Sequence, residues 1–331
     1  MFSRSALRSL TGSSCSPTGI ACQGSTKRLV DSSSHLRAYS TARPLAYLEK
    51  LSESPLSRSV AHHPSSGQSA DPSELDRHIS LLTLDRAPAR NAIGVQMLGE
   101  LEQCVNAVRH DGTRVLVVRS LVPSTFCAGA DLRERKSMSP AEVNDFLLGL
   151  RRTFTALEKL EVPSISALDG TALGGGLELA LATDVRVAGP GAKLGLTETR
   201  LGIIPGAGGT LRLTRQVGTS RAKDLIFSAR ILDGRTALEF GLVEHYAPAQ
   251  DKEHEGDEAL NLSVQLARSM AANGPLALRA AKAAIDRSLG IDNEAALDWE
   301  RACYDRLMDS NDRQEGLRAF AEKRAPRYTG T

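Results

Sequence analysis

The sequence predicts an α/β core followed by an all-helical C-terminal region. In the first part of the chain, short apolar runs rich in β-branched residues alternate with a segment of helical periodicity, and glycine-rich turns follow two of these runs. From Asp257 onward the patterns are only helical, in Ala-rich and charge-rich stretches that Gly274-Pro275 and Gly290 interrupt.

The expected elements of the core follow one another as strand, helix and strand, an order that favours parallel pairing. Strands are expected at 78–84, 114–120, 162–168 and 183–189, and a helix at 95–109. In the C-terminal region, the stretches LNLSVQLARSMAA and PLALRAAKAAIDRSL are expected to be helices, because both combine apolar periodicity with good helix formers.

The composition is that of an ordinary globular protein of one or two domains, with 331 residues of which 41% are hydrophobic and 24% charged. A membrane span needs roughly 20 apolar residues in a row, and Pro205 and three glycines interrupt even the run at 203–213. The five cysteines are scattered, with no CxxC pair and no histidine cluster at metal-ligand spacing. The sequence therefore predicts a reducing compartment, no membrane span and no metal site.

The first 39 residues have the composition of a mitochondrial transit peptide. Residues 1–48 hold six basic residues against a single acid, Asp31, and they are rich in Ser and Thr. The segment LRAYS at 36–40 looks like a matrix processing site, so we expect cleavage after Tyr39 and a location in the mitochondrial matrix. Cleavage there would leave 36 basic and 38 acidic residues, a charge balance that does not indicate nucleic-acid binding.

Three segments are expected after this leader. Residues 40–75 contain no hydrophobic period of 2 or 3.6 and are expected to form a flexible linker. The α/β core is expected to occupy residues 76–256, and the C-terminal helical region residues 257–331.

Three consecutive glycines, 174–176, precede a stretch that otherwise has the pattern of a helix. Glycine allows a close approach of the backbone, and a helix N-terminus leaves its first N–H groups without partners. Such a turn either presents N–H donors to an anion or carbonyl oxygen, or simply lets the helix pack closely. A P-loop and a dinucleotide fingerprint are both excluded by the spacing. A second turn of this kind, STFCAGADLRER at 124–135, could converge on the same oxygen.

These two turns belong to a set of separated motifs that occur in a fixed order. The motifs are FCAGADL at 126–132, ALGGGLELA at 172–180, GLTE at 195–198 and IPGAGGT at 204–210. The set resembles the enoyl-CoA hydratase (crotonase) superfamily over residues 78–331. Within it, FCAGADLRER, ALGGGLELALATDVRVA, KDLIFSARILDG and the ending CYDRLMDSNDRQEGLRAFAEKRAPRY are similar to the mitochondrial methylglutaconyl-CoA hydratase group.

The resemblance implies a fold and an assembly. It implies a crotonase-like spiral of ββα units, followed by a C-terminal helical trimerisation region, so a homotrimer or a dimer of trimers is expected. The substrate would be an acyl-CoA thioester, and no cofactor or metal is expected because coenzyme A is part of the substrate.

The resemblance also implies a set of site residues. The backbone N–H groups of Ala130 and Gly175 match the oxyanion hole that holds the thioester carbonyl. Glu178 and Glu198 match the two catalytic glutamates, with Glu178 as the principal base on water and Glu198 as the principal acid. Gly206 matches the position whose backbone orients that water.

Basic residues are candidates for the two anionic ends of the substrate. Lys323, Arg324 and Arg327 could meet the CoA phosphates, in this chain or from a neighbouring subunit. The carboxylate of a methylglutaconyl group also calls for a cation, and four residues could supply it: Arg133, Arg135, Lys136 and Arg200. The sequence does not distinguish among them.

The function implied is the hydration of 3-methylglutaconyl-CoA to 3-hydroxy-3-methylglutaryl-CoA in leucine breakdown. Because both glutamates are present, hydration is favoured over a double-bond shift, but a general short-chain enoyl-CoA hydratase or an isomerase stays an alternative. An RNA-binding protein is the alternative from another class. The segment at 95–114 argues against it, since it has no lysine and a net charge of −1.

Overall fold

The structure, a computed structural model, describes residues 43–60, 71–249 and 256–331. The strands and helices of the described residues all belong to the compact unit Pro44–Thr331. The predicted transit peptide at 1–39, with its cleavage site after Tyr39, lies outside the described residues.

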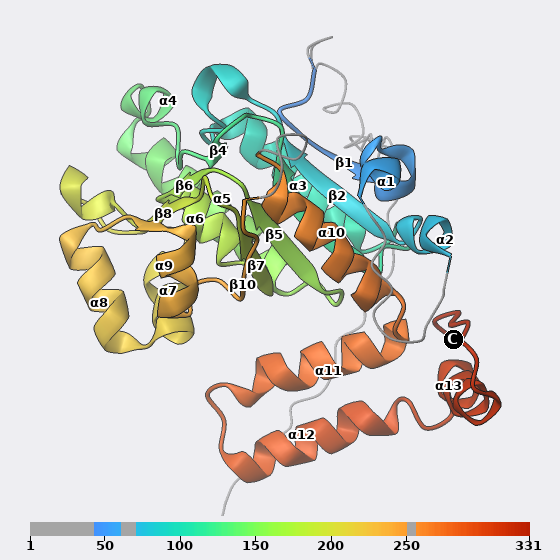
Figure 1. Ribbon diagram of the computed structural model, residues 1–331. Helices are drawn as coiled ribbons and strands as arrows, with labels where there is room; N and C mark the ends of the chain where they lie inside the picture. The colour runs from blue at the N-terminus through green and yellow to red at the C-terminus, as the bar shows by residue number, and fades with distance from the viewer. Residues whose placement is uncertain (1–42, 61–70, 250–255) are drawn as a thin grey trace, which may run out of the picture. The chain divides into compact units, whose positions relative to one another are not determined.

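A six-stranded sheet forms the centre of the molecule (Figure 1). Its strands, in spatial order, are β1 (Ala46–Lys50), β2 (Ile79–Leu84), β3 (Val115–Ser120), β5 (Ser164–Leu168), β7 (Val185–Ala188) and β10 (His245–Tyr246). All neighbours pair in parallel except β1, which runs antiparallel to β2. The predicted parallel strands are therefore confirmed, each beginning one or two residues later than expected.

A second, four-stranded sheet is built by the same passes of the chain. It contains β4 (Thr125–Cys127), β6 (Thr171–Leu173), β8 (Lys193–Gly195) and β9 (Leu232–Asp233), of which β4, β6 and β8 are parallel neighbours. The pairs β3–β4, β5–β6 and β7–β8 each place one strand in each sheet before the chain turns into helices. This repetition is the predicted spiral of ββα units.

Helices lie between the successive strands along the chain. They are α3 (Val95–Val108), α4 (Leu132–Lys136), α5 (Pro140–Glu158), α6 (Gly175–Ala180), α7 (Gly209–Val217), α8 (Thr219–Ser228) and α9 (Gly234–Phe240). Side chains of β2 alternate between two apolar clusters: Leu82 and Leu84 share one with α3 and α5, whereas Ile79 and Leu81 share the other with α10. The first sheet is therefore buried on both faces, as parallel sheets usually are.

The prediction of a flexible linker at 40–75 is wrong for the described residues within it. Strand β1 pairs with β2 along its whole length, and the helices η2 (Leu51–Glu53), α1 (Leu56–Ser59) and α2 (Pro72–Asp76) follow it. The apolar anchors Leu51, Val60 and Leu75 are buried but lie far apart in the sequence, so no regular period reveals them. The core thus begins before residue 76.

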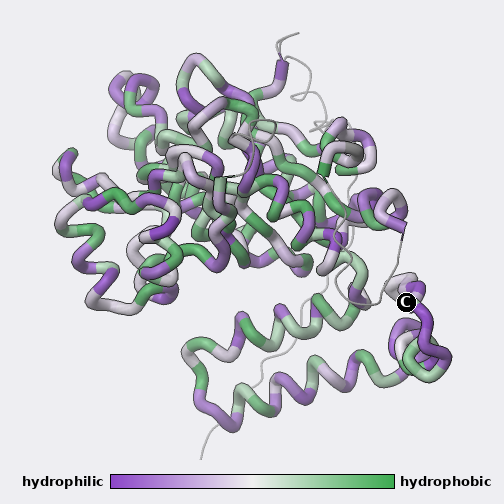
Figure 2. Tube along the Cα trace, in the orientation of Figure 1, coloured by the Kyte–Doolittle hydropathy of each residue, from purple (hydrophilic) through white to green (hydrophobic). Residues whose placement is uncertain are grey.

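The predicted C-terminal helices are confirmed as α10 (Glu258–Ala271), α11 (Pro275–Ser288), α12 (Asn293–Asp305) and α13 (Asn311–Glu322). Helix α10 packs on β3, β5 and β7 and belongs to the core, so the helical region does not form a separate piece from residue 257. Helices α11 and α12 form an antiparallel pair, and hydrophobic and hydrophilic residues alternate along them (Figures 1 and 2). Among the described helices, none has the length and apolar character needed to cross a membrane.

A buried ion pair fastens α10 to the segment before β2. The carboxylate of Asp76 accepts hydrogen bonds from Nε and Nη2 of Arg268, both at 2.8 Å, and from the hydroxyl of Ser57 at 2.7 Å. Arg268 also donates to the carbonyl oxygens of Val60 and Ser57. Both charged side chains are almost fully buried, so each depends on the other for its hydrogen bonds.

Replacing Arg268 by Met should lower the free energy of unfolding by about 3–5 kcal/mol, because Asp76 would keep a buried charge without its partner. Urea denaturation of the purified protein measures this loss. As a matched control, Arg301→Met breaks the exposed ion pair with Asp305 on α12 and should cost at most about 1 kcal/mol. Equal losses in the two variants would contradict the role given to the buried pair.

Candidate active site

A cavity of about 570 Å³ lies at the carboxyl ends of β4, β6 and β8. These three strands are parallel neighbours, so the turns that follow them meet at one edge of the second sheet. The structure therefore brings all five residues of the predicted catalytic set to this cavity: Ala130, Gly175, Glu178, Glu198 and Gly206. Much of the remaining wall is apolar and comes from α4, α5 and the segment 201–204.

The N–H groups of Ala130 and Gly175 are neighbours without acceptors. The N–H of Ile93 donates to the carbonyl oxygen of Gly129, and the carbonyl oxygen of Ile93 accepts from the N–H of Asp131. Because these two bonds flank Ala130 on one side, the N–H of Ala130 points to the opposite side. Gly175 is the first residue of α6, where an N–H has no partner inside the helix. Within the described parts of the chain neither N–H donates to another group, and together they can bind one carbonyl oxygen.

The three consecutive glycines are required by close contacts. A Cβ on Gly175 would stand 3.3 Å from the nitrogen of Ala130, so the two N–H groups could no longer share an acceptor freely. Gly174 has φ +50° and lies against the carboxyl group of Glu198, and Gly176 has no space for a side chain beside the carbonyl oxygen of Cys127. Glycine lowers the helix propensity at these three positions, but it allows the backbone of this turn to approach Ala130, Cys127 and Glu198 closely.

Glu178 is buried and held at one oxygen. Its Oε1 accepts hydrogen bonds from the N–H groups of Ala207 at 2.8 Å and Gly209 at 2.7 Å. Burial raises the pKa of Glu178, while these two bonds and the charge of Arg212 oppose the rise because they stabilise the carboxylate. Since both bonds fall on Oε1, the other oxygen is available to accept a proton.

Glu198 has a different environment. It begins the short helix η4 (Glu198–Leu201), and its Oε2 is buried with no hydrogen-bond partner among the described residues. Burial raises the pKa of Glu198 to about 7, and the negative charge of Glu178 adds to the rise. The two carboxyl groups thus differ in environment: hydrogen bonds stabilise the charged form of Glu178, whereas burial and the charge of Glu178 both favour the protonated form of Glu198.

Two residues that the sequence analysis did not select hold the Ala130 turn in place. The guanidinium of Arg86 pairs with Asp131 at 2.8 Å, and Asp131 caps α4 by accepting from the N–H groups of Arg133 and Glu134. The buried side chain of Asn91 donates to the carbonyl oxygen of Phe126 at 2.9 Å. The available signal for both is their place in the segment RAPARNA at 86–92, which follows the buried strand β2 and Asp85.

The cysteine inside the first motif is inert. Cys127 is completely buried, its Sγ donates to the carbonyl oxygen of Asn91, and burial raises the pKa of the thiol to about 12. The described residues contain no group of three His, Cys, Asp or Glu side chains placed to hold a metal ion.

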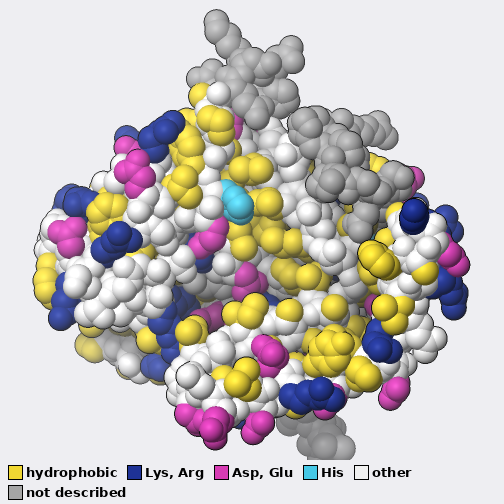
Figure 3. Space-filling model, turned by 60° about the horizontal axis from the view of Figure 1, so that its bottom comes forward, with side chains coloured by type: hydrophobic (Ala, Val, Ile, Leu, Met, Phe, Trp, Pro, Cys, Tyr) yellow, Lys and Arg dark blue, Asp and Glu magenta, His cyan; other side chains and the backbone are white. Residues whose placement is uncertain are grey.

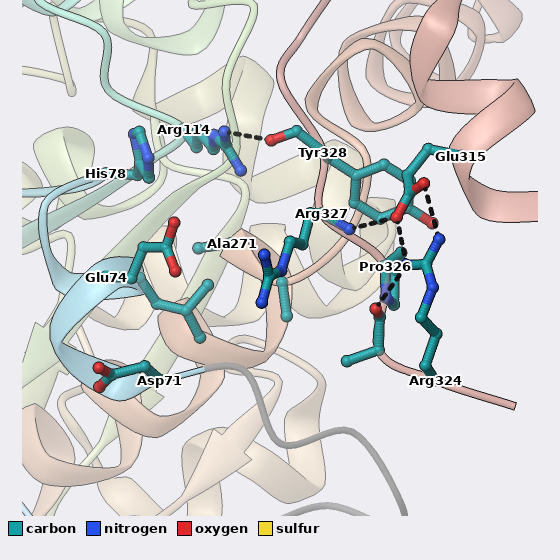
Figure 4. Close-up of a pocket in the computed structure, with 13 residues that line it drawn as sticks. Asp71, Glu74, His78, Arg114, Ala271, Glu315, Arg324, Pro326, Arg327 and Tyr328 are labelled. Carbon is teal, nitrogen blue, oxygen red and sulfur yellow. Dashed lines mark hydrogen bonds and ion pairs between the residues drawn. The ribbon is translucent and has the colours of Figure 1, made fainter. Parts of the chain in front are cut away.

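The structure does not bring Lys323 and Arg324 to the cavity of the two glutamates. Arg324 pairs with Glu315 and Glu322, both at 2.6 Å, and lines a second cavity of about 710 Å³ that shares no residue with the first. In this second cavity, which Figure 4 draws, Arg327 and Arg114 lie opposite Glu74 on α2. A contact between these C-terminal cations and CoA within one chain is therefore not supported, and contact from a neighbouring subunit stays a prediction.

The chain is similar in sequence to known mitochondrial proteins. A methylglutaconyl-CoA hydratase from Mus musculus, named as mitochondrial, is 48% identical over 258 residues, which is 78% of this chain and 81% of the relative. The mitochondrial enoyl-CoA hydratase domain-containing protein 2 from Mus musculus is 46% identical over 76% of this chain and 84% of its own length.

The chain is also similar to solved structures. The crystal structure of an enoyl-CoA hydratase from Bacillus anthracis has a TM-score of 0.73 and 40% sequence identity, and the match covers 77% of this chain and 96% of the other. The family profile for enoyl-CoA hydratase/isomerase matches residues 74–331, which include both sheets' parallel strands and all five residues of the predicted catalytic set. The chain belongs to the enoyl-CoA hydratase/isomerase family.

Proposed function

We propose that this enzyme adds water across the Cα=Cβ bond of 3-methylglutaconyl-CoA to give 3-hydroxy-3-methylglutaryl-CoA, a step of leucine breakdown. One observation carries the reaction type: two free N–H groups and two carboxyl groups of unequal acidity line one cavity. The similarity to the mouse methylglutaconyl-CoA hydratase supports the choice of substrate.

The proposed mechanism divides the work among these groups. The thioester oxygen accepts hydrogen bonds from the N–H groups of Ala130 and Gly175, which stabilise the enolate charge as it forms. Glu178 takes a proton from water while the water oxygen bonds to Cβ and the π electrons move toward the thioester oxygen. Glu198 then gives its proton to Cα as the carbonyl re-forms, and Gly206 lies at the cavity where its backbone would orient the water.

The atoms and charges of this reaction balance without a further reagent. Water supplies the hydroxyl on Cβ, and transfer of its proton from Glu178 to Glu198 restores both groups for the next cycle. The oxidation of Cβ and the reduction of Cα cancel, so the addition of water is redox-neutral overall, and we propose that the enzyme uses neither a redox cofactor nor a metal, with coenzyme A entering as part of the substrate.

We also propose a homotrimer, or a dimer of trimers, in the mitochondrial matrix. Large apolar side chains are exposed on the C-terminal helices: Ile285, Leu297, Leu317 and Phe320. Figure 3 brings the lower side of the molecule forward and shows exposed hydrophobic groups there. A mitochondrial location is supported by the composition of residues 1–39 and by the mitochondrial name of the mouse relative, and the segment LRAYS at 36–40, which looks like a matrix processing site, supports the matrix.

A general short-chain enoyl-CoA hydratase or isomerase is the second candidate. The mostly apolar wall of the cavity favours it, because Leu147, Leu150 and Ile204 would suit a purely hydrocarbon acyl chain. For RNA binding the structure offers no support. The charged residues of α3 are Glu100 and Glu102, and the helix contains no cation to meet phosphates.

The variants Glu178→Gln and Glu198→Gln should each lower kcat by about 10²- to 10⁴-fold, because an amide keeps the shape of the side chain but exchanges no proton. Steady-state hydration measures the loss, and binding of the saturated analogue butyryl-CoA should persist in both. Glu102→Gln, on the exposed face of α3, is the matched control and should leave kcat unchanged. Turnover near the wild-type rate in either site variant would refute the paired-carboxyl mechanism.

The dependence of kcat/KM on pH should be bell-shaped, because Glu178 must be ionised and Glu198 protonated. The pKa of Glu198 is raised to about 7, so its proton is present below that pH and activity should fall as pH rises through about 7. On the acid side activity should fall as Glu178 becomes protonated. The two groups interact, so the observed values belong to the pair. Activity that stays constant well above pH 7 would remove Glu198 as the acid.

The substrate is tested with protein that begins at Ser40. The measurement is kcat/KM for 3-methylglutaconyl-CoA and for crotonyl-CoA, followed by loss of the conjugated thioester absorbance. We expect a clear preference for 3-methylglutaconyl-CoA. A preference for crotonyl-CoA would instead establish the general hydratase, and turnover of neither would contradict hydration itself.

A further inference from the structure

We infer that Arg135 binds the carboxylate at the far end of the acyl group and thereby selects a dicarboxylic enoyl-CoA over a monocarboxylic one. The inference rests on the proposed function and names the specificity-determining residue of the same cavity. Arg135 touches no reacting atom in this proposal. Its role is to pair with the end of the substrate opposite the thioester.

The geometry of α4 separates Arg135 from the other basic residues near it. Leu132 and Arg135 lie three residues apart, so they share one face of the helix, and both line the cavity. Arg133 and Lys136 lie on the other faces, are exposed and do not line the cavity. Of the four candidate cations in the sequence, three lie within this short helix, and one of these faces the site.

The fourth candidate is already engaged elsewhere. Arg200 is exposed, and its Nη2 donates to the carbonyl oxygen of Ala229 at 2.8 Å, so its guanidinium is held by α8 and not by the cavity. Arg86, another cation near the Ala130 turn, pairs with Asp131. Neither residue lines the cavity.

The surroundings of Arg135 call for an anion. Its side chain is half-buried, and in the described residues its guanidinium makes no ion pair or hydrogen bond. The charged residues that line the cavity are Arg135, Glu178 and Glu198, and the two glutamates serve the reacting carbons in the proposed mechanism. Since no acceptor among the described residues contacts the Arg135 guanidinium and much of the wall is apolar, this guanidinium gains most from a ligand that brings its own negative charge.

Two anions of the substrate could occupy this position: the distal carboxylate and a CoA phosphate. Guanidinium groups bind both through paired N–H donors. The half-buried, mostly apolar setting matches a single carboxylate better than strongly hydrated phosphates. The experiment separates the two, because crotonyl-CoA carries the same phosphates but no distal carboxylate.

The test replaces Arg135 by Met, whose unbranched side chain resembles the aliphatic part of Arg but carries no charge. For 3-methylglutaconyl-CoA, kcat/KM should fall by about 10- to 100-fold, while kcat/KM for crotonyl-CoA stays near the wild-type value. Arg135→Lys should retain part of the preference, because the charge remains but the forked geometry is lost. Arg133→Met is the matched control on the same helix and should leave the ratio of the two values unchanged.

Binding of saturated thioesters tests the inference without turnover. Glutaryl-CoA, which ends in a carboxylate, should bind wild type more tightly than Arg135→Met, whereas butyryl-CoA should bind both equally. An equal fall for both ligands would place a CoA phosphate at Arg135, and no change for either would remove Arg135 from the site; both results overturn the inference. If wild type hydrates neither enoyl-CoA, the proposed function fails, and the glutaryl-CoA comparison still decides whether Arg135 reads a carboxylate.

Discussion

Two peptide N–H groups from separate turns, those of Ala130 and Gly175, lie side by side without acceptors among the described residues, and much of the structure around the cavity serves that close approach. The turns lie side by side because β4 and β6 are parallel neighbours, which end at the same edge of the second sheet. They come close enough because glycines occupy the contact, with positive φ at Gly129 and Gly174. The first turn keeps its course because Asn91 and the Arg86–Asp131 pair hold it from behind. A third parallel strand, β8, then delivers Glu198 to the same edge.

The unequal acidity of the two glutamates has a simple structural cause. Both are removed from water, which raises the pKa of each. Glu178 lies at the N-terminus of α7, where two N–H groups and the nearby Arg212 favour its charged form. Glu198 has one buried oxygen without a partner and faces the charge of Glu178. Local backbone geometry, rather than residue type, thus gives the two glutamates different environments.

The sequence predicts those parts of the molecule whose pattern is local. Strands β2, β3, β5 and β7 are continuous apolar runs. The motifs that carry Ala130, Gly175 and the two glutamates are short contiguous segments, and the structure places all four residues at one cavity. Edge strand β1 escapes prediction because its pairing with β2 is a long-range contact with no period of its own. The fold is also needed to tell which of the four basic residues lines the cavity: the course of α4 selects Arg135 from three of them, and Arg200 on η4 is not in the lining.

The position of α10 has a consequence for how the chain folds. One face of β2, β3, β5 and β7 is covered by this helix, whose sequence begins at residue 258, and Arg268 is the partner that Asp76 needs. During synthesis from the N-terminus, the chain therefore exposes an apolar sheet face, and the carboxylate of Asp76 stays unpaired, until most of the chain has been made. Truncation before α10 would not yield a smaller stable domain. The fold closes late, through contacts that join residues almost 200 positions apart.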